Sequence, residues 1–159
     1  MSPSDLKQAQ EDAAKLIMSL EGFRSHAYLD SRCIKTIGYG STRDLKGHSI
    51  RLYATCTKEE AKSYLEYHLK KYVFPQLEKL DLPPKIYVAV CSLVYNVGSL
   101  GTQIKKVLTE KKWDELPECF LSYDKINGIE SEGLKNRRKK EIAYFTKDDK
   151  NNGVVKQST

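Results

Sequence analysis

An apolar run near the middle of the chain constrains the fold more than any other feature. Residues 86–97 read IYVAVCSLVYNV, so that apolar side chains face almost every direction around a helix. A helix of this kind has to be buried by other elements. Pro84 suits the first turn of a helix, and Gly98 follows the end of the run. The sequence therefore predicts a central helix, near the middle of the core, on which other elements pack.

Further helices are predicted where apolar side chains recur at three- and four-residue steps. The first spans about residues 5–20, with Ser4 as its N-cap. Another begins at the capping box formed by Thr57 and Glu60, and Pro75 is expected to kink or break it. The remaining predicted elements are a short helix with Ile104, Val107 and Leu108, a segment around Trp113, a turn at Asn127-Gly128 and a last helix capped by Ser131.

Residues 23–56 differ from the rest of the chain because they contain short segments with β propensity that are separated by turns. Gly38, Gly40 and Gly47 punctuate them, and the run before Gly40 is typical of a strand bent by close backbone approach. We predict a small antiparallel hairpin or three-stranded sheet here. Such a sheet is too small to be stable alone and must pack on helices.

These patterns predict an α+β, mostly helical fold with two lobes. The β-rich lobe covers about residues 23–56, and the helical lobe covers about 57–146 together with the N-terminal helix. We expect residues 1–146 to form a single domain. The segment 147–159 offers little to bury and is predicted to be a mobile tail.

Charge favours an anionic partner, because the 159 residues carry a formal net charge of +6. Nucleic acid, an anionic membrane face and an acidic bacterial envelope polymer all meet this condition. The sequence has no zinc-finger spacing, no RRM-type aromatic motif and no single basic helix, which argues against nucleic acid. Charged side chains interrupt the apolar positions of residues 1–20, so we predict neither a signal peptide nor a membrane anchor there.

Cysteine and histidine spacing argues against a metal site, and no cofactor is predicted. The cysteines lack any C-x-x-C pair, and free thiols are expected. Cys91 and Cys119 fall inside apolar helical patterns and are predicted to be core residues. The scattered positions are Cys33, Cys56, Cys91 and Cys119 for cysteine, and His26, His48 and His68 for histidine.

Residues 21–42 place two carboxylates and a threonine at short intervals. Glu21 precedes Gly22, a common helix stop, and Asp30 and Thr36 follow nine and fifteen positions later. Hydrolysis of a glycosidic bond needs two acids in different environments. A helix C-terminus favours the protonated form of a carboxyl group, which suits Glu21 as an acid, whereas Asp30 in polar company should stay ionised. Spacing alone does not separate this hypothesis from two solvated surface carboxylates.

Four motifs in order give a more specific indication. They are Glu21-x8-Asp30-x5-Thr36 continuing as Thr-Ile-Gly-Tyr-Gly, Tyr95-Asn96-Val97-Gly98, Trp113-Asp114-Glu115, and Gly133-Leu134-x-x-Arg137-Arg138-x-x-Glu141. Together they resemble the motifs of the phage-type lysozymes, glycoside hydrolase family 24. The similarity covers roughly residues 10–146.

This resemblance implies a two-lobed lysozyme that hydrolyses the β-1,4 bond between N-acetylmuramic acid and N-acetylglucosamine in peptidoglycan. It places Glu21 on the general acid, Asp30 on the carboxylate that orients or activates water, and Thr36 on the residue that positions the water. It also implies that Arg137, from the last helix, lies close to Glu21. The positions that match cleft-lining or substrate-binding residues are Thr42, Tyr95, Asn96 and Arg137.

Two positions depart from the family pattern. Cys33 stands where the family commonly has glycine, and cysteine tolerates a positive φ poorly, so the local turn geometry is in question. Ser41 stands where the family usually has histidine. Because that histidine is not needed for the proton transfers, we expect altered local stability rather than lost activity.

The resulting hypothesis is a phage or prophage endolysin with peptidoglycan as its partner. We expect a monomer without membrane insertion, made in the cytoplasm, that depends on a separate membrane-permeabilising protein to reach the wall. Three alternatives remain: a catalytically inactive peptidoglycan-binding module on the same fold, a nucleic-acid binder, and a lytic transglycosylase. Intact Glu21, Asp30 and Thr36 argue against the first of these.

Overall fold

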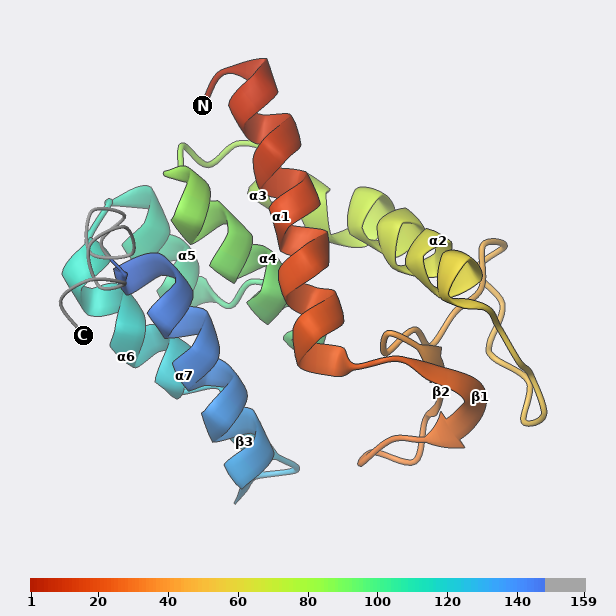
Figure 1. The fold of residues 1–159 in the computed structure, drawn as a ribbon. Coiled ribbons are helices and arrows are strands. Elements are labelled where there is room, and N and C mark those ends of the chain that lie inside the picture. Colours follow the sequence, from red (N-terminus) through yellow and green to blue (C-terminus); the bar gives the residue numbers. More distant parts are fainter. Residues whose placement is uncertain (148–159) are drawn as a thin grey trace, which may run out of the picture.

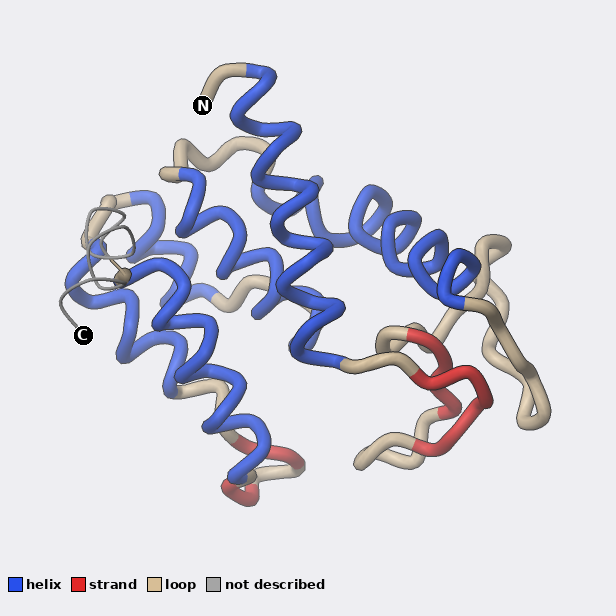
Figure 2. Tube along the Cα trace, viewed as in Figure 1, coloured by secondary structure: helices blue, strands red, loops and turns tan. Residues whose placement is uncertain are grey.

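The computed structural model describes residues 1–147 and shows a mostly helical protein with two short antiparallel hairpins at its edges (Figures 1 and 2). In chain order the elements are α1 (Pro3–Glu21), β1 (Arg24–Leu29), β2 (Lys35–Gly38), α2 (Lys58–His68), a π-helical turn (Leu69–Val73), α3 (Phe74–Leu77), α4 (Pro84–Val97), α5 (Thr102–Thr109), a 3-10 turn (Trp113–Glu115), α6 (Leu116–Leu121), β3 (Lys125–Ile126), β4 (Ile129–Glu130) and α7 (Glu132–Thr146). The predicted α+β, mostly helical fold class is confirmed. The domain limits 1–146 stay a prediction, and the predicted mobile tail, apart from Lys147, lies outside the described residues.

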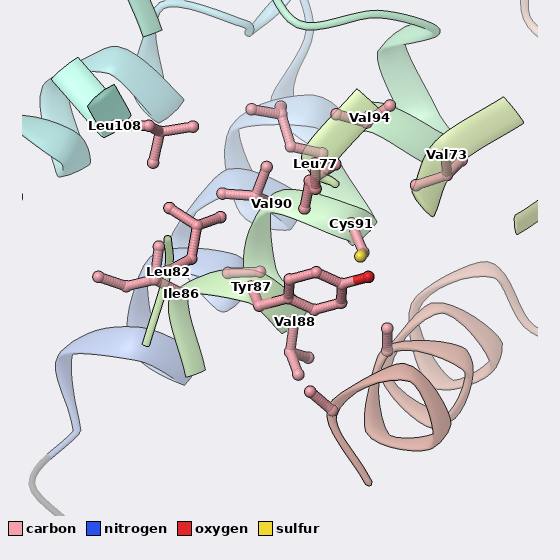
Figure 3. Close-up of a cluster of buried hydrophobic side chains, with 14 of the residues drawn as sticks. Val73, Leu77, Leu82, Ile86, Tyr87, Val88, Val90, Cys91, Val94 and Leu108 are labelled. Carbon is pink, nitrogen blue, oxygen red and sulfur yellow. The ribbon is translucent and has the colours of Figure 1, made fainter. Parts of the chain in front are cut away.

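The predicted central helix is confirmed as α4. It begins at Pro84, ends before Gly98, and packs against both α1 and α7. Every residue from Ile86 to Val94 is buried. Figure 3 shows Tyr87, Val90 and Cys91 of α4 within the main hydrophobic cluster, together with Leu77 of α3. The apolar pattern therefore located the centre of the core correctly.

Helix α1 begins two residues earlier than predicted, and its cap is different. Ser2, not Ser4, is the N-cap: its hydroxyl accepts a hydrogen bond from the Asp5 N–H at 3.1 Å. Pro3 then occupies the first helical position, which suits its fixed φ and missing N–H. At the other end Gly22 adopts φ 71° and terminates the helix, so Glu21 is the last helical residue, as predicted.

The β1–β2 hairpin forms the smaller lobe, at the end of α1 that is far from the N-terminus (Figure 1). Tyr28 pairs with Thr36 across the hairpin. A second hydrophobic cluster holds this lobe together and consists of Ile37, Ile50, Cys56 and Ala61. Because neighbouring strand side chains point to opposite faces, Ile37 enters this cluster while Thr36 points away from it. The predicted dependence of the small sheet on a helix is met by Ala61 of α2.

Helix α2 leads from this lobe towards the core. The predicted capping box is present: the Thr57 hydroxyl accepts from the Glu60 N–H at 3.1 Å, and the Glu60 carboxylate accepts from the Thr57 N–H at 2.9 Å. Pro75 does not end the helical path, which runs on to Leu77. A widened π-helical turn over Leu69–Val73 precedes it, and this accommodates a ring that would clash with the carbonyl four residues earlier.

The cysteines of the chain, all of which lie in the described part, are unpaired thiols. Cys91 is fully buried in α4, as predicted, whereas Cys119 is only half-buried and packs at the margin of the core. Within residues 1–147 no helix has both the length and the apolar character required to cross a membrane.

Candidate active site

The Glu21 carboxyl group is fixed between two parts of the chain that are distant in sequence. Its side chain is 17% exposed and its Oε2 accepts a hydrogen bond from Nη1 of Arg137 at 2.5 Å. Arg137 lies on α7 and is 10% exposed. The predicted proximity of Arg137 to Glu21 is therefore confirmed. The contact links the last helix to the end of the first.

Gly40 leaves the space that the Glu21 carboxyl group occupies. A Cβ atom at Gly40 would lie 2.5 Å from Oε1 of Glu21, closer than atoms can approach. Gly40 also adopts φ 81°, a left-handed conformation that favours glycine. The sequence indicated a close backbone approach at these glycines but not what approaches Gly40. The structure identifies it as Glu21.

Tyr95 joins the helical core to the segment that precedes Gly40. Its hydroxyl donates to the backbone carbonyl of Tyr39 at 2.8 Å, and Tyr39 packs against both hydrophobic clusters. Burial raises the pKa of Tyr95, and the charge of Glu21 acts in the same direction, so the hydroxyl stays a neutral donor. The predicted substrate-binding role of Tyr95 stays a prediction, since its hydroxyl has a partner within the chain.

Asp30 closes the hairpin loop with one of its two carboxylate oxygens. Oδ1 accepts hydrogen bonds from the N–H groups of Arg32 at 2.8 Å and Ile34 at 2.9 Å. The Cys33 N–H donates to the Asp30 carbonyl at 2.9 Å, and Cys33 has φ 60°. The other oxygen, Oδ2, lies 4.0 Å from the Arg32 guanidinium. Oδ2 therefore remains available as an acceptor.

A second loop in the same lobe repeats this geometry. Oδ1 of Asp44 accepts from the N–H groups of Lys46 at 2.8 Å and His48 at 2.9 Å, and Gly47 has φ 79°. Loop closure alone thus does not mark Asp30 as catalytic. Cys33 adopts the left-handed conformation that Gly47 adopts in the Asp44 loop, and both loops make the same pair of hydrogen bonds. Cysteine at position 33 is therefore compatible with this turn geometry.

Thr36 is buried, and its hydroxyl donates to the backbone carbonyl of Ile34 at 2.8 Å. Tyr28, the residue paired with Thr36 across the hairpin, is influenced by the charges of Glu21 and Asp30. Partial burial raises the pKa of Tyr28, and the charges of Glu21 and Asp30 both raise it further. The Tyr28 hydroxyl is therefore within electrostatic range of both carboxylates. Sequence reasoning missed Tyr28, although its cross-strand position relative to Thr36 was a usable signal.

The contacts of the other predicted binding residues, Thr42 and Asn96, do not indicate a role in substrate binding. Asn96 accepts a hydrogen bond from Nη2 of Arg138 at 2.8 Å through its side-chain oxygen, so that oxygen is engaged inside the protein. Thr42 is half-buried next to Ser41, and no contact of its side chain within residues 1–147 defines a role. Ser41 itself is buried and fixed by two backbone hydrogen bonds with Ile37, each 2.9 Å. The binding roles of Thr42 and Asn96 stay predictions.

Two further charged residues, Arg138 and Glu141, are fully buried near this site. The sequence offered them only as part of a motif, since the alternation of charged residues on α7 is typical of a solvated face. No three His, Cys, Asp or Glu side chains in residues 1–147 converge as metal ligands would. A cavity of about 470 Å³ lies around Leu6, Phe74 and Tyr87, and none of the predicted site residues lines it.

Comparison with known proteins places this chain in a family. The sequence model of the family described as phage lysozyme matches residues 18–141, which include all the candidate site residues. The chain belongs to the phage lysozyme family. It is accordingly a lysozyme-type hydrolase. The endolysin of Salmonella phage P22 is 33% identical over 130 residues, a match that covers 79% of this chain and 88% of that protein.

Solved structures agree with this assignment. An endolysin from Escherichia coli O157:H7 phage FAHEc1 superimposes with a TM-score of 0.74 at 28% identity, over 85% of this chain and 90% of that chain. A mutant of the P22 lysozyme gives a TM-score of 0.70 at 30% identity, over 85% and 95% of the two chains. The helical fold with a small hairpin lobe is therefore that of a phage lysozyme.

We predict that Gly40→Ala in this phage lysozyme lowers the rate of wall lysis by much more than a loss of folded protein could explain. The new methyl group displaces the Glu21 carboxyl group from its position on Arg137, and a displacement of about 1 Å costs on the order of 100-fold in rate. Gly47→Ala is the matched control, because Gly47 has nearly the same φ but nothing within 4 Å of its Cβ position. Wall-lysis rates and melting temperatures of both variants check this. Equal losses of activity in the two variants would contradict it.

Cys33→Gly is predicted to raise the free energy of unfolding by about 1 kcal/mol, since a non-glycine residue at φ 60° is strained and glycine is not. The equivalent change in the Asp44 loop, Gly47→Cys, should lower stability by a similar amount. Urea unfolding of both variants measures the two effects. A destabilised Cys33→Gly protein would show that the cysteine side chain makes a contact that outweighs its backbone strain.

Proposed function

We propose that this phage lysozyme cleaves the β-1,4 bond between N-acetylmuramic acid and N-acetylglucosamine in peptidoglycan, with Glu21 as the general acid. Asp30 and Thr36 hold the attacking water. Hydrolysis of peptidoglycan follows from the phage lysozyme and endolysin relatives. The roles of Glu21, Asp30 and Thr36 are those that the family resemblance implies, and the geometry of the three residues supports them.

The position of Glu21 is the observation that carries the proposal. Its carboxyl group sits at the end of α1, with Oε1 against Gly40 and Oε2 on Arg137. It is mostly shielded from solvent, and the hairpin that carries Asp30 follows directly. A carboxyl group fixed in this way can meet a glycosidic oxygen with its proton at a defined distance, which is the geometric requirement of a general acid.

The hydrogen-bond pattern of the hairpin suits a water held by two acceptors. Oδ1 of Asp30 is occupied by two loop N–H groups, which leaves Oδ2 for the water. The Thr36 hydroxyl gives its own hydrogen to the Ile34 carbonyl, so its oxygen can accept another. A water that donates both hydrogens, one to Asp30 and one to Thr36, directs an oxygen lone pair outward for attack on the sugar carbon. Asp30 takes the proton that the water loses.

Net charge is compatible with this substrate, because a formal charge of +6 favours approach to an anionic bacterial wall. The monomeric state, synthesis in the cytoplasm and dependence on a separate membrane-permeabilising protein stay predictions. A catalytically inactive wall-binding module and a lytic transglycosylase are the two alternatives that product analysis separates.

Glu21→Gln should abolish hydrolysis of purified peptidoglycan while leaving the fold unchanged, because an amide keeps the shape but has no proton to give. The loss expected for a missing general acid is roughly 10²–10⁴-fold. Glu11→Gln is the control, since Glu11 lies exposed on the same helix. Mass spectrometry of the digest identifies the products: reducing ends indicate hydrolysis, and 1,6-anhydro ends a transglycosylase. A Glu21→Gln variant with parental activity would exclude Glu21 as the acid.

Asp30→Asn and Asp44→Asn separate a catalytic carboxylate from one that only closes a loop. Both aspartates make the same pair of loop hydrogen bonds, and asparagine can retain them through its side-chain oxygen. We therefore expect similar small changes in melting temperature. Only Asp30→Asn should lose activity, by about 100-fold or more, because only Asp30 activates water. Similar activity in both variants would reduce Asp30 to a structural residue.

A further inference from the structure

The Arg137 guanidinium contacts two carboxylates, and only one of them belongs to the proposed catalytic machinery. Nη1 donates to Glu21, and Nε donates to Oε2 of Glu141 at 3.3 Å. Nη2 lies 3.4 Å from the Ser92 carbonyl and 3.3 Å from the Ser92 hydroxyl, and donates to both. All three nitrogens of the guanidinium are therefore held. Its position against Glu21 depends on Ser92 and Glu141.

Glu141 is in turn fixed on every side within the core. The Ser92 hydroxyl donates to Oε2 at 2.5 Å, and Nη2 of Arg138 donates to the same oxygen at 3.3 Å. Nε of Arg138 lies 2.7 Å from Oε1 without being aimed at it, so this contact is an ion pair and not a hydrogen bond. The side chains of Glu141 and Arg138 are both 0% exposed. Such a pair has little freedom to rearrange.

We propose that Glu141 and Ser92 are positioning residues that hold the Arg137 guanidinium against the Glu21 carboxyl group. This inference rests on the proposed role of Glu21 as the general acid. Neither residue contacts the reacting atoms. Both act through Arg137.

The orientation of the Glu21 carboxyl group depends on Arg137. Tyr28 from β1, Tyr95 from α4 and Arg138 from α7 interact electrostatically with Glu21. The hydrogen bond to its carboxyl group comes from Arg137. Whatever holds the Arg137 guanidinium in place therefore also fixes the position of the proposed acid.

Glu141 is the acidic partner that Arg137 and Arg138 share. Burial raises its pKa, while Arg138, the Ser92 hydroxyl and Arg137 all act in the opposite direction. Hydrogen bonds between a guanidinium and a carboxylate are strong and directional, so the Glu141 carboxylate holds Arg137 better than a neutral group would.

The test is the kcat and KM of peptidoglycan hydrolysis by Glu141→Gln, which keeps the shape of the side chain and removes its charge. We expect kcat to fall by about 10-fold with KM unchanged, because Arg137 loses its acidic partner and no longer fixes the Glu21 carboxyl group. Glu141→Asp keeps the charge and should return kcat towards its parental value. Glu132→Gln, an exposed change on the same helix, should leave both constants unchanged.

Ser92→Ala provides a second route, should Glu141→Gln fail to fold. Without the hydroxyl, Arg137 loses one acceptor and Glu141 loses one donor, so kcat should fall by a smaller factor with KM unchanged. Parental kcat values for folded Glu141→Gln or Ser92→Ala proteins, with Glu21→Gln inactive, would overturn this inference and leave the proposed function intact. Full activity of Glu21→Gln would overturn both.

Discussion

Burial of α4 is the constraint on which the rest of the structure depends. The helix is apolar on nearly all sides, and it is enclosed by α1 on one side and α7 on another. Ser92 is a polar residue in the middle of this buried stretch, and its hydroxyl needs a partner. Glu141 of α7 provides one. A buried carboxylate needs positive charge in turn, and Arg137 and Arg138 supply it.

The same chain of requirements reaches the active site. Once Glu141 and Ser92 hold Arg137, the guanidinium has one nitrogen left to project, and that nitrogen meets Glu21 at the end of α1. Glu21 is therefore positioned by the core on one side. On the other it is positioned by the hairpin lobe, where Gly40 leaves room for its carboxyl group. The proposed acid stands where the two lobes meet.

Sequence reasoning was accurate where local chemistry decides the structure. The capping box at Thr57, the glycine stop after Glu21 and the enclosed helix after Pro84 each follow from a few neighbouring residues. It misplaced the first cap at Ser4, because serine also occurs at position 2 and Pro3 fits the position after it. Periodicity cannot rank two candidates of the same residue type that lie two positions apart. Contacts between residues distant in sequence could not be predicted in this way. The contact of Arg137 with Glu21 was predicted only through the family resemblance. The contact of Gly40 with Glu21 and the electrostatic partners of Tyr28 were not predicted. The repeated loops at Asp30 and Asp44 show the opposite limit, since the same local geometry arises twice. Asp30 differs in that its charge and that of Glu21 both act on Tyr28.

The buried charges have no simple explanation in stability. Replacing a buried ion pair by apolar side chains of similar volume is often neutral or stabilising, whereas removing one partner is strongly destabilising. An apolar side chain in place of Glu141 would suit the buried surface between α4 and α7. It would leave Arg137 without one of the contacts that hold it. The network is therefore better explained by what it does to Arg137, and through Arg137 to Glu21, than by the packing energy of the core.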